Sequence, residues 1–582
     1  MIKTLAKYLK GYEKYAIACI FCVVIEAVLE IMIPFMMAKI VDIGITNRDL
    51  DYVIRVGLLM FGMSLVSLLA GAAGSYLSSK AGMGFGSQIR KALFDKIQDF
   101  SFSNIDKFST PSLVTRMTTD ITNLQNSYQM LLRMCVRAPF SLICAMIMSF
   151  LVNVKLASIY LVAVIILGAL LAIIIWRAMG YFTAMFKKYD DLNESVQENV
   201  SAIRVVKAYV REKYEKSRFT KASGNVYRMA VKAERIVSFN APLMMLTVYS
   251  CILGISWLGA KMIVQSALTT GELMMLLAYC MSILMNLMML SMVFVMLSMS
   301  VASAERVSEV LNETPDIVNP ENPVYKVKDG SIVFDHVSFR YNKEGKKNVL
   351  NDIDLSIKEG ETIGIIGGTG SAKSSLVNLI SRLYDVSEGR LLVGGKDVRE
   401  YDIETLRDEV SVVLQKNVLF SGTILDNLRW GDENATEEEC KRACHLACAD
   451  EFIDRMPDGY HTYIEQGGSN VSGGQKQRLC IARALLKKPK ILILDDSTSA
   501  VDTATDAKIR EAFAKEIPDT TKLIIAQRVS SIQSAGRIIV MDNGEISGFD
   551  THENLMKSNE IYRDVYESQT KGGGDFDENG GE

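Results

Sequence analysis

The chain has 582 residues, too many for one hydrophobic core, so at least two domains are expected. Hydrophobic residues make up 49% of it and the mean hydropathy is +0.17, which is high for a soluble protein and low for one embedded wholly in lipid. These values predict a membrane part joined to a soluble part, and the net charge of −3 excludes the strongly basic balance typical of nucleic-acid binding. The ten cysteines lack the paired spacing of an extracellular disulfide scaffold, so buried thiols are expected.

Residues 1–10 carry lysines three and four positions apart, with Leu and Tyr between them. This pattern predicts a short amphipathic helix on the cytoplasmic face of a membrane, with a solvated helical start as the alternative. No cleavable signal peptide is expected.

Six apolar segments long enough to cross a membrane as helices fill the first half of the chain. They cover roughly residues 15–38, 53–79, 130–152, 156–178, 239–261 and 273–303. Short turns alternate with two long loops rich in Lys and Arg. Because basic loops stay on the cytoplasmic side, both termini and both long loops are expected inside.

The two long loops are predicted to be helical. Residues 187–221 carry apolar residues at helical spacing, without Gly or Pro. Helices of about 25 residues would extend ~35 Å beyond the membrane at 1.5 Å per residue. Short transverse helices are expected near the bends, at residues 106–116 and 205–218, where they would contact a domain below.

Two acidic residues in the first span, Glu26 and Glu30, lie four positions apart and therefore share a helix face. Ionisable side chains are costly inside a membrane, so these two are candidates for contact with substrate or protons. A hydrogen bond to a neighbouring helix is the alternative. Arg133 and Arg137, in the third span, are expected to snorkel to lipid headgroups.

A stripe of methionines follows one face of the sixth span. Its members are Met281, Met285, Met288, Met292, Met296 and Met299. Methionine is flexible and polarizable and suits a surface that accepts varied apolar ligands, while ordinary packing is the alternative. Met285 and Met292, together with Glu26 and Glu30, form a candidate substrate cavity.

A linker is predicted at residues 312–330, which hold three prolines and no apolar period. It would separate a transmembrane domain at residues 1–311 from a soluble domain at 331–567. In the soluble part, residues 332–341 alternate between apolar and polar side chains, which predicts a β-strand. Tyr341, at its end, could stack on adenine.

The clearest motif is a phosphate loop, GGTGSAKS, between a strand at residues 362–366 and a helix at 375–383. Its backbone N–H groups and the helix N-terminus would receive phosphate oxygens, with Lys373 reaching the β- and γ-phosphates and Ser374 binding Mg²⁺. Ala372 stands where Gly is usual, and its methyl is tolerable if φ stays negative. The predicted ATP contacts here are Gly367, Thr369, Gly370, Ser371, Ala372, Lys373, Ser374 and Ser375.

Three further segments carry chemistry. Gln415 follows a predicted strand and could reach the metal. Two glycines stand at the start of a predicted helix in Ser472-Gly473-Gly474-Gln475. The N–H groups of this helix start form a second candidate phosphate-binding site, suited to nucleotide held by another subunit. A buried strand at residues 491–494 ends at Asp495 and Asp496, of which the first would organise Mg²⁺.

These motifs together resemble the nucleotide-binding domain of ABC transporters, and the six preceding spans resemble an exporter-type half-transporter. The resemblance implies an all-α six-helix membrane domain with long cytoplasmic extensions, fused to an α/β P-loop ATPase domain. It also implies a dimer that binds two ATP molecules with Mg²⁺, each between the phosphate loop of one subunit and the signature of the other. The implied metal-site residues are Ser374, Gln415 and Asp495, and the implied dimer-contact loop is Ser499, Ala500, Val501 and Asp502.

Two residues depart from the family at catalytic positions. Asp496 replaces the general-base Glu, which sets its carboxylate ~1.5 Å back, and a shift of that size can cost ~100-fold in rate. Gln527 replaces the switch His and cannot take a proton. Because the signature is intact, we hypothesise a heterodimer in which this chain holds a degenerate ATP site and completes a competent site on a partner. One alternative is neutral drift in an otherwise working enzyme, and another is a slow homodimeric exporter.

Near the signature, Cys440, Cys444 and Cys448 are expected on one helix face beside His445; they are read as packing residues, since zinc sites prefer closer Cys pairs on loops. The acidic, glycine-rich tail at residues 568–582 is predicted to be disordered.

The sequence therefore predicts an exporter of an amphipathic drug, lipid or peptide in a bacterial cytoplasmic membrane. A nucleotide-gated regulatory membrane protein is the alternative, and an importer is disfavoured by the order of the domains.

Overall fold

The residues that the computed structural model describes are 2–341, 345, 347–497 and 500–571. They form two compact units. The first unit comprises the residues up to 98 together with 109–313, and the second comprises 99–108 together with the chain from 314 onward. The short segment 99–108 thus belongs with the soluble unit, although it lies within the first half of the sequence.

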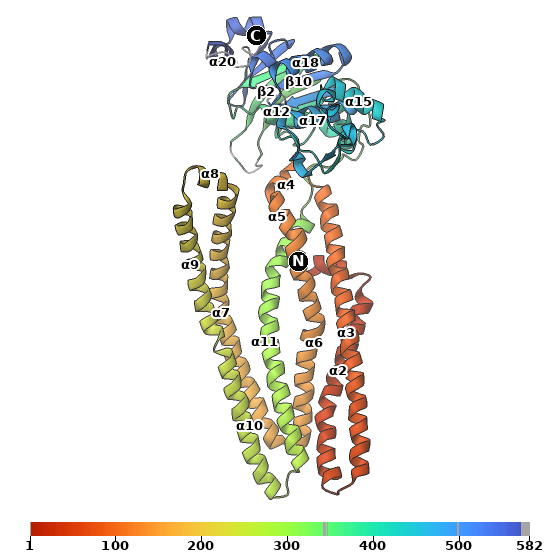
Figure 1. Ribbon diagram of the computed structural model, residues 1–582, viewed down its shortest axis with the longest axis vertical. Coiled ribbons are helices and arrows are strands. Elements are labelled where there is room, and N and C mark those ends of the chain that lie inside the picture. Colours follow the sequence, from red (N-terminus) through yellow and green to blue (C-terminus); the bar gives the residue numbers. More distant parts are fainter. Residues whose placement is uncertain (1, 342–344, 346, 498–499, 572–582) are drawn as a thin grey trace. The chain divides into compact units, whose positions relative to one another are not determined.

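Six helices in the described part of the first unit are long and apolar enough to cross a membrane. They are α2 (Glu13–Lys39), α3 (Leu50–Gln98), α6 (Ile121–Val152), α7 (Val154–Ser201), α10 (Asn240–Val264) and α11 (Thr270–Asn312) (Figure 1). The predicted six-helix architecture is confirmed. Several helices run far past their apolar segment, because the polar residues that follow keep the helical periodicity.

Local signals fix where these helices begin. Asn153 caps α7 by accepting a hydrogen bond from the backbone N–H of Leu156. A reciprocal capping box of Thr269 and Glu272 starts α11. Inside the bundle, the buried Tyr160 donates its hydroxyl to the Leu276 carbonyl at 2.7 Å, which ties α7 to α11.

The long loops are helical hairpins, as the pattern indicated. α7 lies beside α9 (Glu212–Val237), and α8 (Ile203–Ala208) crosses between them at the tip (Figure 1). The first loop contains α4 (Phe102–Phe108) and α5 (Thr110–Thr115). Both transverse helices, α4 and α8, begin a few residues earlier than predicted, and Val210, with φ of +52°, ends the α8 turn.

The second unit is built on a six-stranded sheet of order β12-β11-β3-β10-β9-β6, in which only the edge strand β12 is antiparallel. A smaller antiparallel sheet has the order β2-β1-β4-β5. The strands of the two sheets are β1 (Ile332–Phe339), β2 (Leu350–Ile357), β3 (Thr362–Gly367), β4 (Glu388–Val393), β5 (Lys396–Asp397), β6 (Val410–Val413), β9 (Ile491–Asp495), β10 (Thr521–Ile525), β11 (Arg537–Asp542) and β12 (Glu545–Asp550). Both β9, with its continuous aliphatic run, and β10 are buried on both faces, as the inner strands of a parallel sheet require.

Helices surround the larger sheet. The helices are α12 (Lys373–Ile380), α13 (Ile403–Glu409), α14 (Ile424–Leu428), α15 (Glu437–Leu446), α16 (Asp450–Ile453), α17 (Gly473–Leu486), α18 (Thr503–Glu516), α19 (His552–Ser558) and α20 (Glu560–Lys571). A separate two-stranded ribbon, formed by β7 (Gly422–Thr423) and β8 (Tyr463–Ile464), belongs to the chain segment that carries helices α14 to α17. The predicted α/β class of this part is confirmed. The prediction of a disordered tail at residues 568–582 is wrong for 568–571, which form the last turn of α20, and residues 572–582 lie outside the described residues.

The order of the strands determines where the candidate site lies. β10 pairs in parallel with β3 on one side and with β9 on the other. Ile525, at the end of β10, is in register with Ile365 and with Asp495. The carboxyl ends of these three strands therefore meet at one edge, which is where parallel sheets place their ligand sites.

Candidate functional site

The phosphate loop connects β3 to α12. Lys373, the first residue of α12, folds back over the loop and donates to the carbonyls of Gly367 and Gly368 at 2.8 and 2.9 Å. Burial lowers the pKa of Lys373, and the carboxylates of Asp495 and Asp496 oppose that shift. At Gly367 an added Cβ would lie 2.2 Å from the Met541 carbonyl oxygen, so only glycine fits between β3 and β11.

Ala372 has φ of +71°, in the left-handed region, so the expectation that its φ stays negative is wrong. A Cβ in that region crowds the following carbonyl and costs about 1–2 kcal/mol, a penalty that glycine avoids. The loop demands this backbone conformation whichever residue occupies the position. The sequence therefore stores strain in its own phosphate loop.

The predicted metal ligands are only partly brought together. Ser374 donates its hydroxyl to Asp495 Oδ1 at 3.0 Å, across the ends of β3 and β9. Burial raises the pKa of Asp495, and the hydrogen bond from Ser374 opposes the shift. Gln415 lies exposed just beyond β6. Hard oxygen donors such as Ser374 and Asp495 suit Mg²⁺, which usually takes one or two protein ligands and completes its shell with phosphates and water.

The two residues that depart from the family pattern contact each other. Gln527, two residues beyond β10, donates its side-chain Nε2 to Asp496 Oδ2 at 2.7 Å. Asp496 has φ of +49°, and its backbone N–H bonds to the Ile525 carbonyl at 3.1 Å. The carboxylate of Asp496 is thus held by a neutral amide that can neither donate a full proton nor accept one.

Tyr341 lies beside the first turn of α12. Its hydroxyl is 2.9 Å from Ser375 Oγ, and its half-exposed ring packs edge-on against Phe339 and Tyr384. An exposed aromatic face next to a phosphate loop is the geometry that adenine stacking needs.

Tyr384 also reaches α4, a contact that the sequence did not reveal. It donates its hydroxyl to Asp106 at 2.7 Å, and its ring packs against Phe102. Asn104 donates to the Thr314 carbonyl at 3.1 Å and accepts from the N–H of Asp316. These bonds attach the 99–108 segment to the rest of the second unit, and one aromatic side chain, Tyr384, separates it from Tyr341.

The signature segment begins α17. Ser472 and Gln475 form a capping box, in which each side chain bonds the other's backbone N–H. At Gly474 an added Cβ would lie 2.7 Å from the Ala500 carbonyl oxygen. The loop after β9, which contains Ala500, can therefore approach α17 this closely only because residue 474 is glycine.

The predicted dimer-contact loop lies against the signature helix. Ala500 donates its N–H to Gln477 Oε1 at 3.0 Å, Val501 is buried, and Asp502 caps α18. Ser499 lies outside the described residues.

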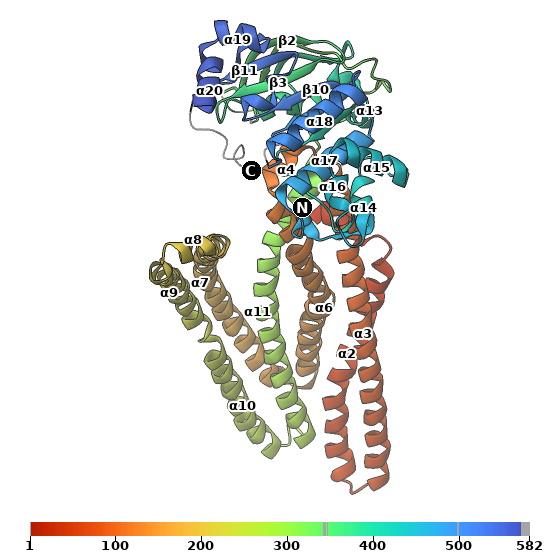
Figure 2. The same cartoon turned by 45° about the horizontal axis from the view of Figure 1, so that its top comes forward.

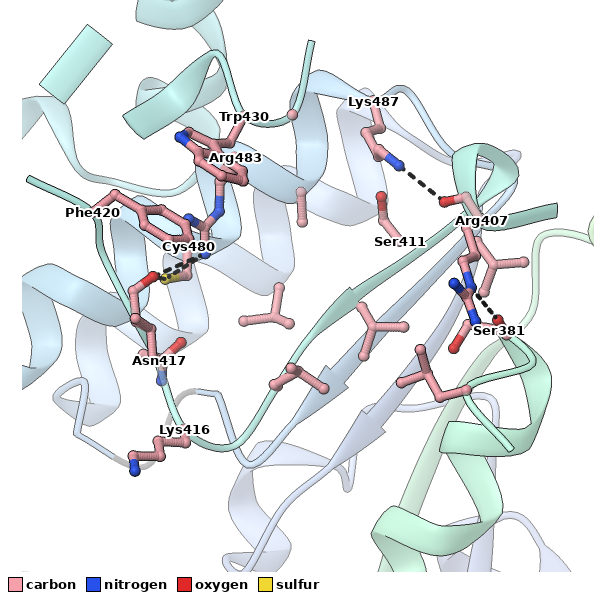
Figure 3. Close-up of a pocket in the computed structure, with 18 of the residues that line it drawn as sticks. Ser381, Arg407, Ser411, Lys416, Asn417, Phe420, Trp430, Cys480, Arg483 and Lys487 are labelled. Carbon is pink, nitrogen blue, oxygen red and sulfur yellow. Dashed lines mark hydrogen bonds between the residues drawn. The ribbon is translucent and has the colours of Figure 1, made fainter. Parts of the chain in front are cut away.

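An apolar cavity of about 420 Å³ borders β6 (Figure 3). Phe420 and Trp430 stack at one end of it with ring centroids 4.0 Å apart, and both rings are largely exposed. Phe102 of α4 also lines the cavity. Basic side chains at the rim are engaged with backbone carbonyls, since Arg483 bonds Val418 and Lys487 bonds Arg407.

Cys440 and Cys444 lie on α15 and are buried, but Cys448 lies beyond its end with φ of +51°. The expectation that all three share one helix face is wrong for Cys448, because α15 ends at Leu446. Burial raises the pKa of both helical thiols, which opposes the ionisation that zinc binding needs.

In the membrane unit, Arg137 of α6 forms ion pairs with both acids of α2. Its guanidinium lies 3.0 Å from Glu26 Oε1 and 2.9 Å from Glu30 Oε2. The expected snorkelling of Arg137 is therefore wrong, because its guanidinium is engaged by the two carboxylates of α2. Arg133 likewise turns inward and donates to Ser75 at 3.1 Å. The predicted alternative, a bond to a neighbouring helix, is what the structure contains.

Met285 and Met292 of α11 are 62% and 63% exposed in the single chain. Met285 lies near the depth of the ion triad, since Tyr279 of α11 bonds the Ile31 carbonyl of the antiparallel α2. Of the predicted stripe, Met299 lies outside the described side chains.

Comparison with known proteins agrees with this geometry. Residues 16–288 match the model of the ABC transporter transmembrane region, and residues 350–499 match that of the ABC transporter family. The chain therefore belongs to the ABC transporter family. With one membrane domain and one ATPase domain it is a half-transporter, a multi-pass membrane protein that binds ATP and pairs with another half.

The relatives are bacterial. An uncharacterized ABC transporter ATP-binding protein of Bacillus subtilis, YfiB, is 38% identical over 97% of both chains. A second uncharacterized one, Rv1273c of Mycobacterium tuberculosis, is 35% identical over 98% of both. A bacterial Atm1-family ABC exporter with ATP bound has the same fold, with a TM-score of 0.82 and 23% identity over 97% of this chain and 99% of that one.

The strain at Ala372 yields a test. Ala372→Gly should stabilise the nucleotide-binding domain by about 1 kcal/mol and raise its melting temperature by about 2–4 °C, because glycine adopts a positive φ without steric cost. The measurement is thermal unfolding of the full-length protein. Ala507→Gly, at an exposed interior position of α18, is the matched control and should lower the melting temperature. A decrease for both variants would show that Ala372 is unstrained.

Proposed function

We propose that this chain is one half of an ATP-driven exporter that moves an amphipathic drug, lipid or peptide outward by alternating access. In this proposal it pairs with a different half-transporter and holds a degenerate ATP site of its own. The observation that carries the proposal is the Gln527–Asp496 hydrogen bond at the carboxyl ends of β10 and β9. The boundary between its two working domains is proposed within residues 312–330.

The chemistry of that pair supports slow hydrolysis. The general base of an ATPase must orient and deprotonate the attacking water, and the Asp496 carboxylate is one methylene short of the usual reach. Its neighbour Gln527 can hydrogen-bond a γ-phosphate but cannot exchange a proton with it. These two features favour a site that binds nucleotide better than it cleaves it.

The signature supports the other half of the proposal. The capping box of Ser472 and Gln475 presents the α17 N-terminus, and Gly474 keeps the approach to Ala500 open. Backbone N–H groups at a helix start are a ready anion site. The chain thus retains the part that would complete a partner's ATP site.

The heterodimer is tested by ATP hydrolysis. The purified chain alone should turn over ATP about 100-fold more slowly than the assembled pair, since a misplaced base costs about that factor. Asp496→Glu combined with Gln527→His should raise the rate of the chain alone. Fast turnover by the unaltered chain alone would contradict the degenerate site. ATP-dependent movement of dye or lipid into inverted vesicles separates the exporter from a nucleotide-gated regulator.

We further propose that the cavity beside β6 receives a cytoplasmic bend from the partner half. The stacked Phe420 and Trp430 offer an exposed apolar face there, and the corresponding bend of this chain exposes Tyr209 and Val210 at 74% and 79%. Large exposed aromatic side chains mark interaction surfaces.

Removing part of that surface should uncouple hydrolysis from transport. Trp430→Ala is expected to lower substrate transport at least about tenfold while ATP affinity stays within twofold, because a buried interface aromatic contributes about 2 kcal/mol or more. Tyr325→Ala, at another exposed aromatic of the same unit, is the control. Equal transport by the two variants would assign Trp430 no docking role.

For the substrate we propose a cationic amphipath that approaches Glu26, Glu30 and the exposed Met285 and Met292. The two carboxylates and the one guanidinium of Arg137 sum to a net charge of −1. A net negative cluster in apolar surroundings favours a further positive charge. The methionine side chains offer adaptable apolar contact beside it.

Charge removal tests this substrate class. Glu26→Gln with Glu30→Gln should weaken transport of cationic dyes about tenfold more than transport of neutral ones, the ratio expected for losing one ion pair of about 1.4 kcal/mol. Glu13→Gln, in the first turn of the same helix, is the control. An equal loss for cationic and neutral dyes would limit the acids to holding Arg137.

A further inference from the structure

The C-terminal helix contacts the loop that carries Gln527. Gln569, in the last turn of α20, accepts a hydrogen bond from the Val529 N–H through Oε1 at 2.8 Å. Its Nε2 donates to the Gln527 carbonyl, also at 2.8 Å. α19 and α20 lie together at one edge of the ATPase unit (Figure 2). A helix remote in sequence from every nucleotide motif thus grips the backbone of a site residue.

The match between side chain and loop is specific to an amide. Gln569 must donate to one backbone group and accept from another two residues further along, and only Asn and Gln carry a neutral donor and acceptor on one fork. Glutamate would keep the bond from Val529 but turn a second acceptor towards the Gln527 carbonyl. A hydrocarbon side chain of the same length would lose both bonds.

The loop is held at its other end as well. Val529 is 2% exposed within the short 3-10 helix Val529–Ser531. Ser531 donates its hydroxyl to Asp506 of α18 at 2.9 Å. The loop is therefore held at two points, by the bond of Ser531 to α18 and by the exposed Gln569, and Gln569 is the contact nearer to Gln527.

α20 is itself fixed by packing. Tyr562 is fully buried, and its hydroxyl lies 2.7 Å from His552 Nδ1. Val565 and Tyr566 pack against the same hydrophobic core as Val529. Because α20 is anchored in this way, the exposed Gln569 side chain is carried next to the loop by a helix that is itself fixed in the core.

We propose that Gln569 is a positioning residue, which sets where the Gln527–Asp496 pair meets the γ-phosphate. It holds the Gln527 backbone carbonyl, while the Gln527 side chain holds Asp496 Oδ2 at 2.7 Å. The inference rests on the proposed function, in which this pair faces the nucleotide. A shift of about 1 Å at such a site can change a rate ~100-fold, so the grip of α20 acts on hydrolysis without touching ATP.

The test compares Gln569→Met, which loses both bonds, with Gln569→Glu, which loses one, in the full-length protein reconstituted in lipid. ATP hydrolysis is measured in the native background and in the Asp496→Glu, Gln527→His background, where turnover is faster. We expect Gln569→Met to lower kcat at least about tenfold, with KM for ATP and the melting temperature little changed, and Gln569→Glu to fall between. Ser568→Ala, whose hydroxyl bonds the Val565 carbonyl of its own helix, should match its parent.

A second arm separates positioning from general stability. In a Gln527→Ala background, Gln569→Met should have little further effect on kcat, because the side chain that it positions is gone. An additive loss, or a kcat unchanged by Gln569→Met while Gln527→Ala lowers it, would overturn the positioning role alone. If neither Gln527→Ala nor Asp496→Asn affects hydrolysis or ATP affinity, the proposed site and this inference both fall.

Discussion

The parallel pairing of β3, β10 and β9 is the constraint on which the rest of the ATPase unit depends. Because these three strands pair in parallel, their carboxyl ends meet at a common edge of the sheet. Each strand ends there at a polar residue or loop that forms part of the same candidate site. The phosphate loop leaves β3, Asp495 ends β9, and Gln527 follows β10. A one-residue slip of β10 would separate Gln527 from Asp496, so the site is as well defined as the hydrophobic register beneath it.

The membrane unit solves a different problem, the placement of charge in apolar surroundings. Arg137 is shared between Glu26 and Glu30, which links α6 to α2 through two charge-assisted contacts. Breaking one partner would leave an uncompensated charge, so the three residues act as one group. Two buried hydroxyls, those of Tyr160 and Tyr279, bond backbone carbonyls of α11 and α2. Polar side chains thereby join α2 to α6, α7 to α11 and α2 to α11 inside the bundle.

The sequence predicted elements and motifs well because they depend on local patterns. The apolar segments, the phosphate loop and the Asp495 strand each carry a recognisable period or spacing. Contacts between distant segments have no such signal: nothing near Gln569 points to Gln527, and Tyr384 has no pattern that predicts Asp106. The φ of Ala372 was misjudged for a related reason, since the closure of the loop sets that backbone angle and the residue type does not.

The phosphate-loop side of this chain and its signature segment differ in backbone strain. At its own phosphate loop and after β9, Ala372 and Asp496 occupy left-handed backbone conformations, and strain of that kind is usually kept only where function requires it. At the signature, Ser472, Gly474 and Gln475 have unstrained caps and close contacts that only glycine permits. Asp tolerates a positive φ better than Glu because its short side chain can bond locally. The shortened acid is therefore matched to its backbone position, and lengthening it must also satisfy a conformation that disfavours longer side chains.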